Sequence, residues 1–128
     1  MKLLADTHTL LWAIGAPDRL GDRARKALAE PGNQVSFSIV SLWEIAIKMS
    51  LGRLELSADW RDLIDSGGQR LNAGWLSLEP EHCHEVATLP WHHRDPFDRI
   101  LVAQAITEGM TLVSRDCRMR TYAADVLW

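Results

Sequence analysis

Short apolar runs alternate with longer amphipathic segments along this chain, and this alternation restricts the possible folds more than any other feature. Runs of strand length occupy residues 2–5, 34–38, 75–78, 110–114 and 125–128. Segments with helical spacing or length lie at 7–15, 20–32, 41–52, 58–70, 79–89 and 96–109. Short strands that alternate with helices predict an α/β domain, in which helices cover both faces of a short, mostly parallel sheet.

The composition is typical of one compact domain. With 128 residues, 47% of them apolar, the chain can bury a core unaided, and no repeat or linker marks a boundary, so we predict a single domain over residues 1–128. No uncharged apolar stretch is long enough to span a membrane. The net charge of −3 gives no overall basic field for nucleic acid. Cys83 and Cys117 have no framework spacing, which favours a cytoplasmic protein with free thiols.

The stretch Asp95-Pro96-Phe97-Asp98 opens the clearest of the predicted helices. Proline favours the first helical position and the residue before it avoids helical conformation, so Asp95 is predicted to be the N-cap. Asp98 is then the third helical residue, where an acid complements the helix dipole. Both aspartates therefore have a structural interpretation, and for Asp98 it is about as strong as a functional one.

Three further acids also have structural explanations when each is taken alone. Ser41-x-x-Glu44 matches a capping box, and Glu44 is spaced to pair with Lys48 on the same helix. Asp6 and Asp116 each follow a predicted strand, where aspartate commonly caps the next turn.

The predicted sheet would bring these four acids together. Asp6 and Asp116 lie at the carboxyl ends of strands, where open parallel sheets bind ligands. Glu44 lies in the helix that leaves strand 34–38, and Asp98 opens the helix that leads into the fourth strand. Clustered carboxylates repel one another unless a cation neutralises them, and oxygen ligands suit Mg²⁺ or Mn²⁺. Water activated by such an ion can attack a phosphodiester, so the pattern indicates a metal-dependent nuclease.

Four stretches of sequence surround these acids in order: ADTHTLLW (5–12), SLWEIAIK (41–48), LPWHHRDPFDRILVAQA (89–105) and TLVSRD (111–116). They resemble the PIN-domain nucleases, and most of all the VapC-type toxins of bacterial toxin–antitoxin pairs. The resemblance implies a PIN-like three-layer sandwich with Asp6, Glu44, Asp98 and Asp116 as the catalytic acids. It further implies Mg²⁺- or Mn²⁺-dependent cleavage of RNA, often transfer or ribosomal RNA, by a homodimer. A VapB-type antitoxin would silence the enzyme by inserting a peptide segment into the acidic groove.

Roles follow from this resemblance combined with the chemistry of carboxylates. We expect Asp6, Asp98 and Asp116 to bind the metal, and Glu44 to hold a metal-bound water or act as general base. In-line attack on phosphorus would leave a 5′-phosphate and a 3′-hydroxyl.

Four residues are candidates for contact with the substrate. Ser114 matches the small hydroxyl residue that the family has two positions before its last acid. Arg94 and Arg115 stand near the predicted rim and could bind phosphates or pair with neighbouring aspartates, and pairing is the favoured role for Arg99. Lys48 could bind RNA or pair with the acid on its own helix.

The histidines and tryptophans are expected to have structural roles. Residues 82–84, His-Cys-His, point to different faces of a helix, which favours a surface helix over a zinc site. Residues 92–93, both histidine, are expected in a solvated loop. Trp12 and Trp43 lie on amphipathic helices and should belong to the core or to a dimer or antitoxin groove, rather than stack on bases.

Two alternative functions remain open. A non-catalytic PIN module that binds RNA would be expected to lack at least one of the four acids, and all four are present. A haloacid-dehalogenase-like phosphatase is suggested by D-T-H-T-L at residues 6–10, but that chemistry needs a second aspartate where His8 stands.

Overall fold

Five short strands form one parallel sheet in the order β3-β2-β1-β4-β5, in a computed structural model that describes all of residues 1–128. The strands are β1 (Lys2–Ala5), β2 (Gln34–Ser38), β3 (Gly74–Leu76), β4 (Thr111–Val113) and β5 (Val126–Leu127). All five runs predicted as strands are strands, and every pairing is parallel. The predicted α/β class is therefore confirmed.

Six α-helices connect and cover the strands. They are α1 (Thr7–Gly15), α2 (Asp22–Ala29), α3 (Ile39–Ser50), α4 (Trp60–Arg70), α5 (Pro80–Thr88) and α6 (Pro96–Glu108). Two short 3-10 helices, η1 (Pro17–Arg19) and η2 (Cys117–Thr121), follow α1 and β4. None of these helices combines the length and the apolar character that a crossing of the bilayer requires.

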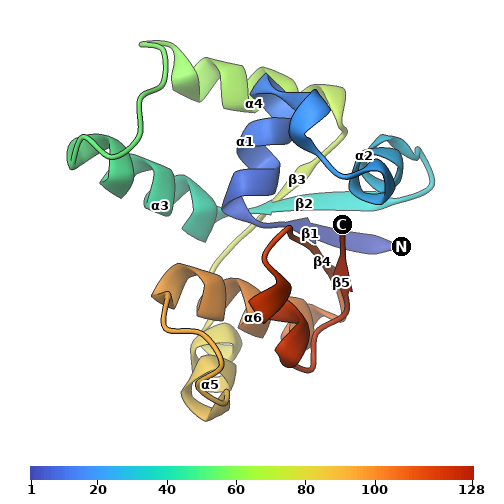
Figure 1. The fold of residues 1–128 in the computed structure, drawn as a ribbon, viewed down its shortest axis with the longest axis vertical. Helices are drawn as coiled ribbons and strands as arrows, with labels where there is room; N and C mark the ends of the chain where they lie inside the picture. The colour runs from blue at the N-terminus through green and yellow to red at the C-terminus, as the bar shows by residue number, and fades with distance from the viewer.

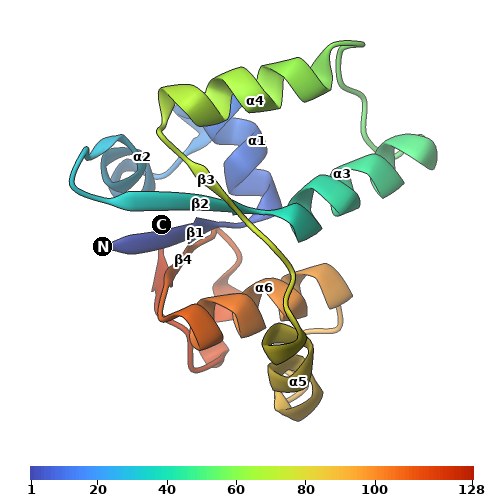
Figure 2. The same cartoon turned by 180° about the vertical axis from the view of Figure 1, so that it is seen from behind.

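The sheet separates two layers of helices. Helices α1, α2 and α4 lie on one face, and α6 lies on the other with α5 packed against it (Figure 1). The view from behind shows α3 leaving the sheet at the end of β2 and lying beside the sheet rather than over it (Figure 2). Helix α3 contacts both α1 and α6, so one end of the sheet is bordered by helices from both layers.

Alternation along β1 explains why the core has two halves. Leu3 and Ala5 face the cluster formed by α1, α2 and α4, whereas Leu4 faces the cluster formed by α6. All three side chains are fully buried. A central parallel strand covered on both faces needs a continuous apolar run, and the sequence KLLA supplies it.

The start of α6 agrees with the sequence prediction. The Asp95 carboxylate accepts hydrogen bonds from the backbone N–H groups of Phe97 (2.8 Å) and Asp98 (3.2 Å). Pro96 is the first helical residue and Asp98 lies in the first turn. Asp95 is therefore the N-cap, and it determines where the carboxylate of Asp98 emerges.

The predicted capping box of α3 is wrong. The helix begins at Ile39, directly after β2, and Ser38 is the N-cap, with its hydroxyl accepting a hydrogen bond from the N–H of Val40 (3.1 Å). Ser41 instead accepts a hydrogen bond from Thr7. Glu44 consequently lies in the second turn of α3, because the chain passes from strand to helix without a loop.

Candidate active site

Asp6 follows β1 and Asp116 lies in the turn after β4, so both acids are at the carboxyl end of the sheet. Strands β1 and β4 are neighbours, and the N–H of Asp6 donates to the carbonyl of Val113 (3.1 Å), which extends their pairing. The Asp6 carboxylate caps α1 by accepting from the N–H of Thr9 (2.8 Å), and only 5% of the residue is exposed. Asp116 caps η2 through the N–H of Arg118 (2.9 Å). Both acids therefore have the predicted capping role and also lie at the predicted edge.

Glu44 is a buried carboxylate held by two side chains. It is 3% exposed, and it accepts a hydrogen bond from the hydroxyl of Thr7 (2.6 Å) and pairs with Lys48 (2.5 Å). Burial lowers the pKa of Lys48, but the hydrogen bond and charge of Glu44 outweigh this, so the pKa is raised overall. Lys48 therefore makes the intrahelical pair that was one of its two predicted roles.

Asp98 carries the clearest electrostatic sign of a shared acidic site. Burial raises its pKa to about 7, and the negative charges of Asp95, Asp6, Glu44 and Asp116 raise it in the same direction. The three other predicted acids, Asp6, Glu44 and Asp116, thus all influence the carboxyl group of Asp98. Because this mutual repulsion is what a cation would relieve, the residues fit a hard divalent ion.

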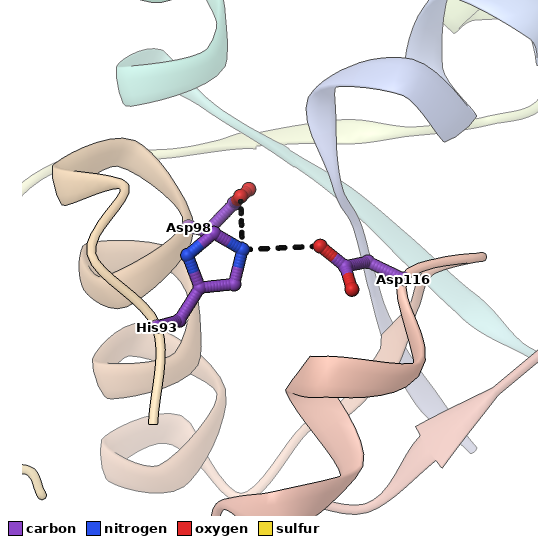
Figure 3. A group of neighbouring side chains, drawn as sticks. All are labelled: His93, Asp98 and Asp116. Atoms are coloured by element: carbon purple, nitrogen blue, oxygen red, sulfur yellow. Dashed lines mark hydrogen bonds and ion pairs between the residues drawn. The ribbon is translucent and has the colours of Figure 1, made fainter. Parts of the chain in front are cut away.

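His93 lies between two of these acids, as Figure 3 shows. Its Nε2 is 3.1 Å from Oδ2 of Asp98 and 3.0 Å from Oδ2 of Asp116. The residue is 5% exposed, so the prediction of a solvated loop is wrong for His93. Two adjacent histidines precede the helix, and no feature of the sequence distinguishes the buried one from the exposed His92.

Asp116 is also held from the solvent side. The Arg118 guanidinium donates from Nε to Oδ1 (3.1 Å) and from Nη2 to Oδ2 (2.9 Å). These bonds with the Arg118 side chain lower the pKa of Asp116 to about 2, and the hydrogen bond from His93 acts in the same direction. Arg118 was not among the predicted site residues. Its spacing of two from Asp116 is the only signal the sequence offers.

The predicted substrate-binding residues lie in different surroundings. Arg115 is exposed and lines a pocket of about 500 Å³ with Asp6 and Asp116. Arg94 is exposed in an apolar groove outside this pocket. Ser114 is 1% exposed, and its hydroxyl accepts from the N–H of Asp116 (3.1 Å), so it shapes the turn that carries this acid. Substrate binding by these residues stays a prediction.

The prediction that Arg99 pairs with a neighbouring aspartate is wrong. Arg99 is 4% exposed and donates to the carbonyls of Val86 (3.2 Å), Leu89 (3.3 Å) and Pro90 (2.8 Å), while its guanidinium stacks 3.8 Å from the ring centre of Trp91. The last carbonyls of a helix have no partners within it, and Arg99 satisfies those at the end of α5.

The surface-helix prediction is wrong for His82, although Cys83 and His84 are exposed. His82 is fully buried; its Nδ1 accepts from the N–H of Glu79 (3.0 Å) and its Nε2 is 2.9 Å from a carboxylate oxygen of Glu108. His82 therefore helps to cap α5 and joins that helix to the end of α6.

Neither tryptophan chosen from the sequence is a fully buried core residue, although Trp12 packs against the core cluster that contains Leu10 and Ile45. Trp43 is 58% exposed and packs edge-on against Phe97, with ring centres 5.3 Å apart, in an apolar groove of about 490 Å³. Trp12 is half-buried and has the guanidinium groups of Arg19 and Arg115 at 5.0 Å and 6.0 Å from its ring centre. Trp43 thus lines a groove, and the use of that groove by a dimer or an antitoxin stays a prediction. Trp12 also lines the pocket that contains Asp6 and Asp116.

Comparison with known proteins finds relatives along nearly the whole chain. Residues 3–125 match the family model described as PIN domain. Ribonuclease VapC22 of Mycobacterium tuberculosis (strain ATCC 25618 / H37Rv) is 26% identical over 121 residues, which cover 94% of this chain and 91% of that protein.

Solved structures have the same fold at low sequence identity. A chain of VapBC2 from Rickettsia felis, bound to a DNA fragment from their promoter, has a TM-score of 0.76 and 15% identity, covering 99% of this chain and 98% of that one. A chain of VapBC-1 from nontypeable Haemophilus influenzae has a TM-score of 0.65 and 15% identity, covering 99% and 97%. These structures confirm the expected fold class.

Proposed function

This chain belongs to the PIN domain family, and on that premise we propose that it is a metal-dependent endoribonuclease acting as the toxin of a toxin–antitoxin pair. The observation that carries the proposal is the crowding of acids around Asp98. Burial, together with four neighbouring carboxylates, raises the pKa of Asp98 to about 7. A structural cap needs no such neighbours. An acidic centre at the carboxyl end of a parallel sheet is what a hydrolase using a divalent cation requires.

We propose Asp6, Asp98 and Asp116 as the residues that hold Mg²⁺ or Mn²⁺. Asp98 and Asp116 already have ligand atoms within 4.8 Å of each other and of His93. Oxygen donors of this kind are those that hard cations prefer. When bound, the ion supplies an acidified water and neutralises charge on the phosphodiester.

Glu44 is the proposed general base or water-holding residue. Each of its oxygens has one partner, the hydroxyl of Thr7 or the ammonium of Lys48, so each keeps a lone pair for a further hydrogen bond. In the proposed reaction Glu44 accepts a proton from the attacking water. The new bond joins that water to phosphorus as the bond to the 3′-oxygen breaks, and the 3′-oxygen takes up a proton from solvent, which leaves a 5′-phosphate and a 3′-hydroxyl.

An RNA substrate is supported by a cationic surface beside the acids. A pocket of about 520 Å³ is lined by Arg19, Lys48 and Arg53, together with His8 and Trp12, and no carboxylate lines it. His8 and Trp12 also line the pocket that contains Asp6 and Asp116, so the two are adjacent. Cations suit backbone phosphates and an aromatic face suits an unpaired base. Transfer or ribosomal RNA is the class that the resemblance suggests.

We propose a cognate VapB-type antitoxin as the protein partner. The similar structures from Rickettsia felis and Haemophilus influenzae are described as VapBC complexes, which supports an equivalent pair here. A homodimer follows from the resemblance to the same family. The phosphatase alternative gains no support, because membership in the PIN family accounts for Asp6 without a second aspartate at position 8.

The test of the proposed function separates Asp98 from Asp95. Purified protein is incubated with single-stranded RNA and Mg²⁺ or Mn²⁺, and the new 5′ ends are analysed for phosphate. We expect Asp98→Asn to abolish cleavage because it removes a charged ligand. Asp95→Asn should retain cleavage and lose only a few tenths of a kcal/mol of stability, since asparagine also caps helices.

Two outcomes would contradict the proposal. Full cleavage by Asp98→Asn would remove this residue from the active site. Cleavage that continues undiminished in excess EDTA would exclude a role for a divalent cation. If the unmodified protein binds RNA without cleaving it under any of these conditions, the non-catalytic alternative is supported instead.

A further inference from the structure

His93 is the one residue of the acidic centre whose ring is held at both nitrogens. The N–H of Asp95 donates to Nδ1 (3.0 Å), and Nε2 lies within hydrogen-bonding distance of Asp98 and Asp116. The backbone N–H of His93 donates to the hydroxyl of Tyr122 (2.9 Å). The family resemblance points to the four acids alone, so these contacts leave the role of His93 to be explained.

The partners of the imidazole determine where it carries its hydrogen. A backbone N–H can only donate, so Nδ1 must accept from Asp95 with its lone pair. In the neutral ring the hydrogen is then on Nε2, which donates it to Oδ2 of Asp116, while Oδ2 of Asp98 lies 3.1 Å from the same nitrogen. A nitrogen that carries a hydrogen has no lone pair for a metal. In this arrangement His93 donates to Asp116 and cannot itself be a ligand.

The imidazole is also fixed in place by the surrounding loop. Tyr122 accepts hydrogen bonds from both the N–H of His93 (2.9 Å) and the guanidinium of Arg99 (3.3 Å), and Arg99 is itself bound to the carbonyls that end α5. Asp95, which binds Nδ1, is the same residue that caps α6. The ring therefore cannot turn without disturbing the start of the helix that carries Asp98.

We propose that His93 is a positioning residue of the metal centre. Its Nε2–H donates to Asp116, and Oδ2 of Asp98 lies 3.1 Å from the same nitrogen, so the ring holds an acid from α6 and an acid from the turn after β4 side by side against their mutual repulsion. Asp98 has no partner at its other oxygen, Oδ1, which stays available to a cation. Hydrogen-bond donors behind metal-binding carboxylates orient these ligands, and their loss typically weakens metal binding 10- to 100-fold. The inference rests on the proposed metal-dependent function.

The first experiment measures Mn²⁺ binding by calorimetry to the full-length protein and three variants. His93→Leu removes the donor, His93→Gln keeps an N–H donor at the end of the side chain, and His92→Leu alters the exposed neighbour as a control. We expect the dissociation constant to rise roughly 10- to 100-fold in His93→Leu and only a few-fold in the other two. Circular dichroism confirms that each variant is folded.

The second experiment takes its result from the unmodified protein, and a variant serves only to assign the signal. Long-range ¹H–¹⁵N spectra of the unmodified protein report which ring nitrogen carries the hydrogen, and the His93→Gln spectrum assigns the signal. We expect the hydrogen on Nε2 both without metal and with saturating Mg²⁺. Transfer of the hydrogen to Nδ1 when Mg²⁺ binds would make His93 a ligand and overturn the positioning role.

The outcomes separate this inference from the proposed function. Equal Mn²⁺ affinity in the unmodified protein and in folded His93→Leu overturns the role of His93 and leaves the metal site intact. Absence of Mn²⁺ and Mg²⁺ binding by the unmodified protein overturns the metal-dependent function, and the inference about His93 falls with it.

Discussion

Single residues show where sequence reasoning about this site succeeds and where it ends. The roles of Asp95 and Asp98 could be separated in advance because proline fixes the helix start, and backbone geometry then places each side chain. His93 could not be predicted, because its position depends on Tyr122, which lies 29 residues further along the chain. Local rules determine caps, but a buried side chain is placed by packing between distant segments.

Asp98 should destabilise the metal-free protein at neutral pH. Its pKa is raised from 3.8 to about 7 on folding, so the folded state binds the proton more tightly than the unfolded state does. The resulting loss in the free energy of unfolding is absent below about pH 4, grows as the pH rises, and is complete above about pH 7. Asp98→Asn cannot ionise and should escape this loss of stability.

We therefore expect Asp98→Asn to unfold with a free energy about 2–4 kcal/mol higher than the unmodified protein at pH 8 in EDTA. The two proteins should be nearly equal in stability near pH 4. Urea denaturation at a series of pH values measures the difference. A variant that is less stable throughout would show that Asp98 serves α6 mainly as a dipole-complementing residue.

Elements were predicted more reliably than the contacts at their ends. Each predicted strand and helix exists because apolar periodicity reports burial directly. The N-cap of α3 was misplaced by three residues, because both Ser38 and Ser41 are suitable caps and only the end of β2 decides between them. This shift moves Glu44 from the first turn to the second, where it meets Thr7 of α1.

Ser38 and Ser41 should consequently differ in their contribution to stability. The Ser38 hydroxyl caps α3 and also donates to the buried side chain of Gln104 in α6 (2.7 Å). Ser38→Ala removes both bonds and should cost about 2 kcal/mol of unfolding free energy. Ser41→Ala removes only a partner of Thr7, which keeps its bond to Glu44, and should cost less than about 1 kcal/mol. Urea denaturation compares them, and a larger loss in Ser41→Ala would restore the predicted capping box.

The distribution of charge over the whole molecule was not visible in its composition. A net charge of −3 suggested no field for nucleic acid, yet three cations line a pocket without carboxylates, adjacent to the pocket that contains Asp6 and Asp116. Arg19 comes from η1, Lys48 from α3 and Arg53 from the loop that follows. These residues meet only because α1 and α3 contact each other, so a summed charge cannot reveal the surface that they form.

This cationic surface should contribute to binding RNA rather than to the chemical step. We expect Arg53→Ala to raise KM for cleavage of a single-stranded RNA roughly fivefold with kcat little changed, because it removes a phosphate contact and none of the proposed catalytic groups. The dependence of KM on salt should weaken as well, since fewer counterions are released. Arg25→Ala, which alters an exposed arginine paired with Asp22 on α2, is the control and should change neither constant. Loss of kcat at unchanged KM in Arg53→Ala would instead place this residue in the chemical step. If KM and its salt dependence are both unchanged, the RNA does not bind along this pocket.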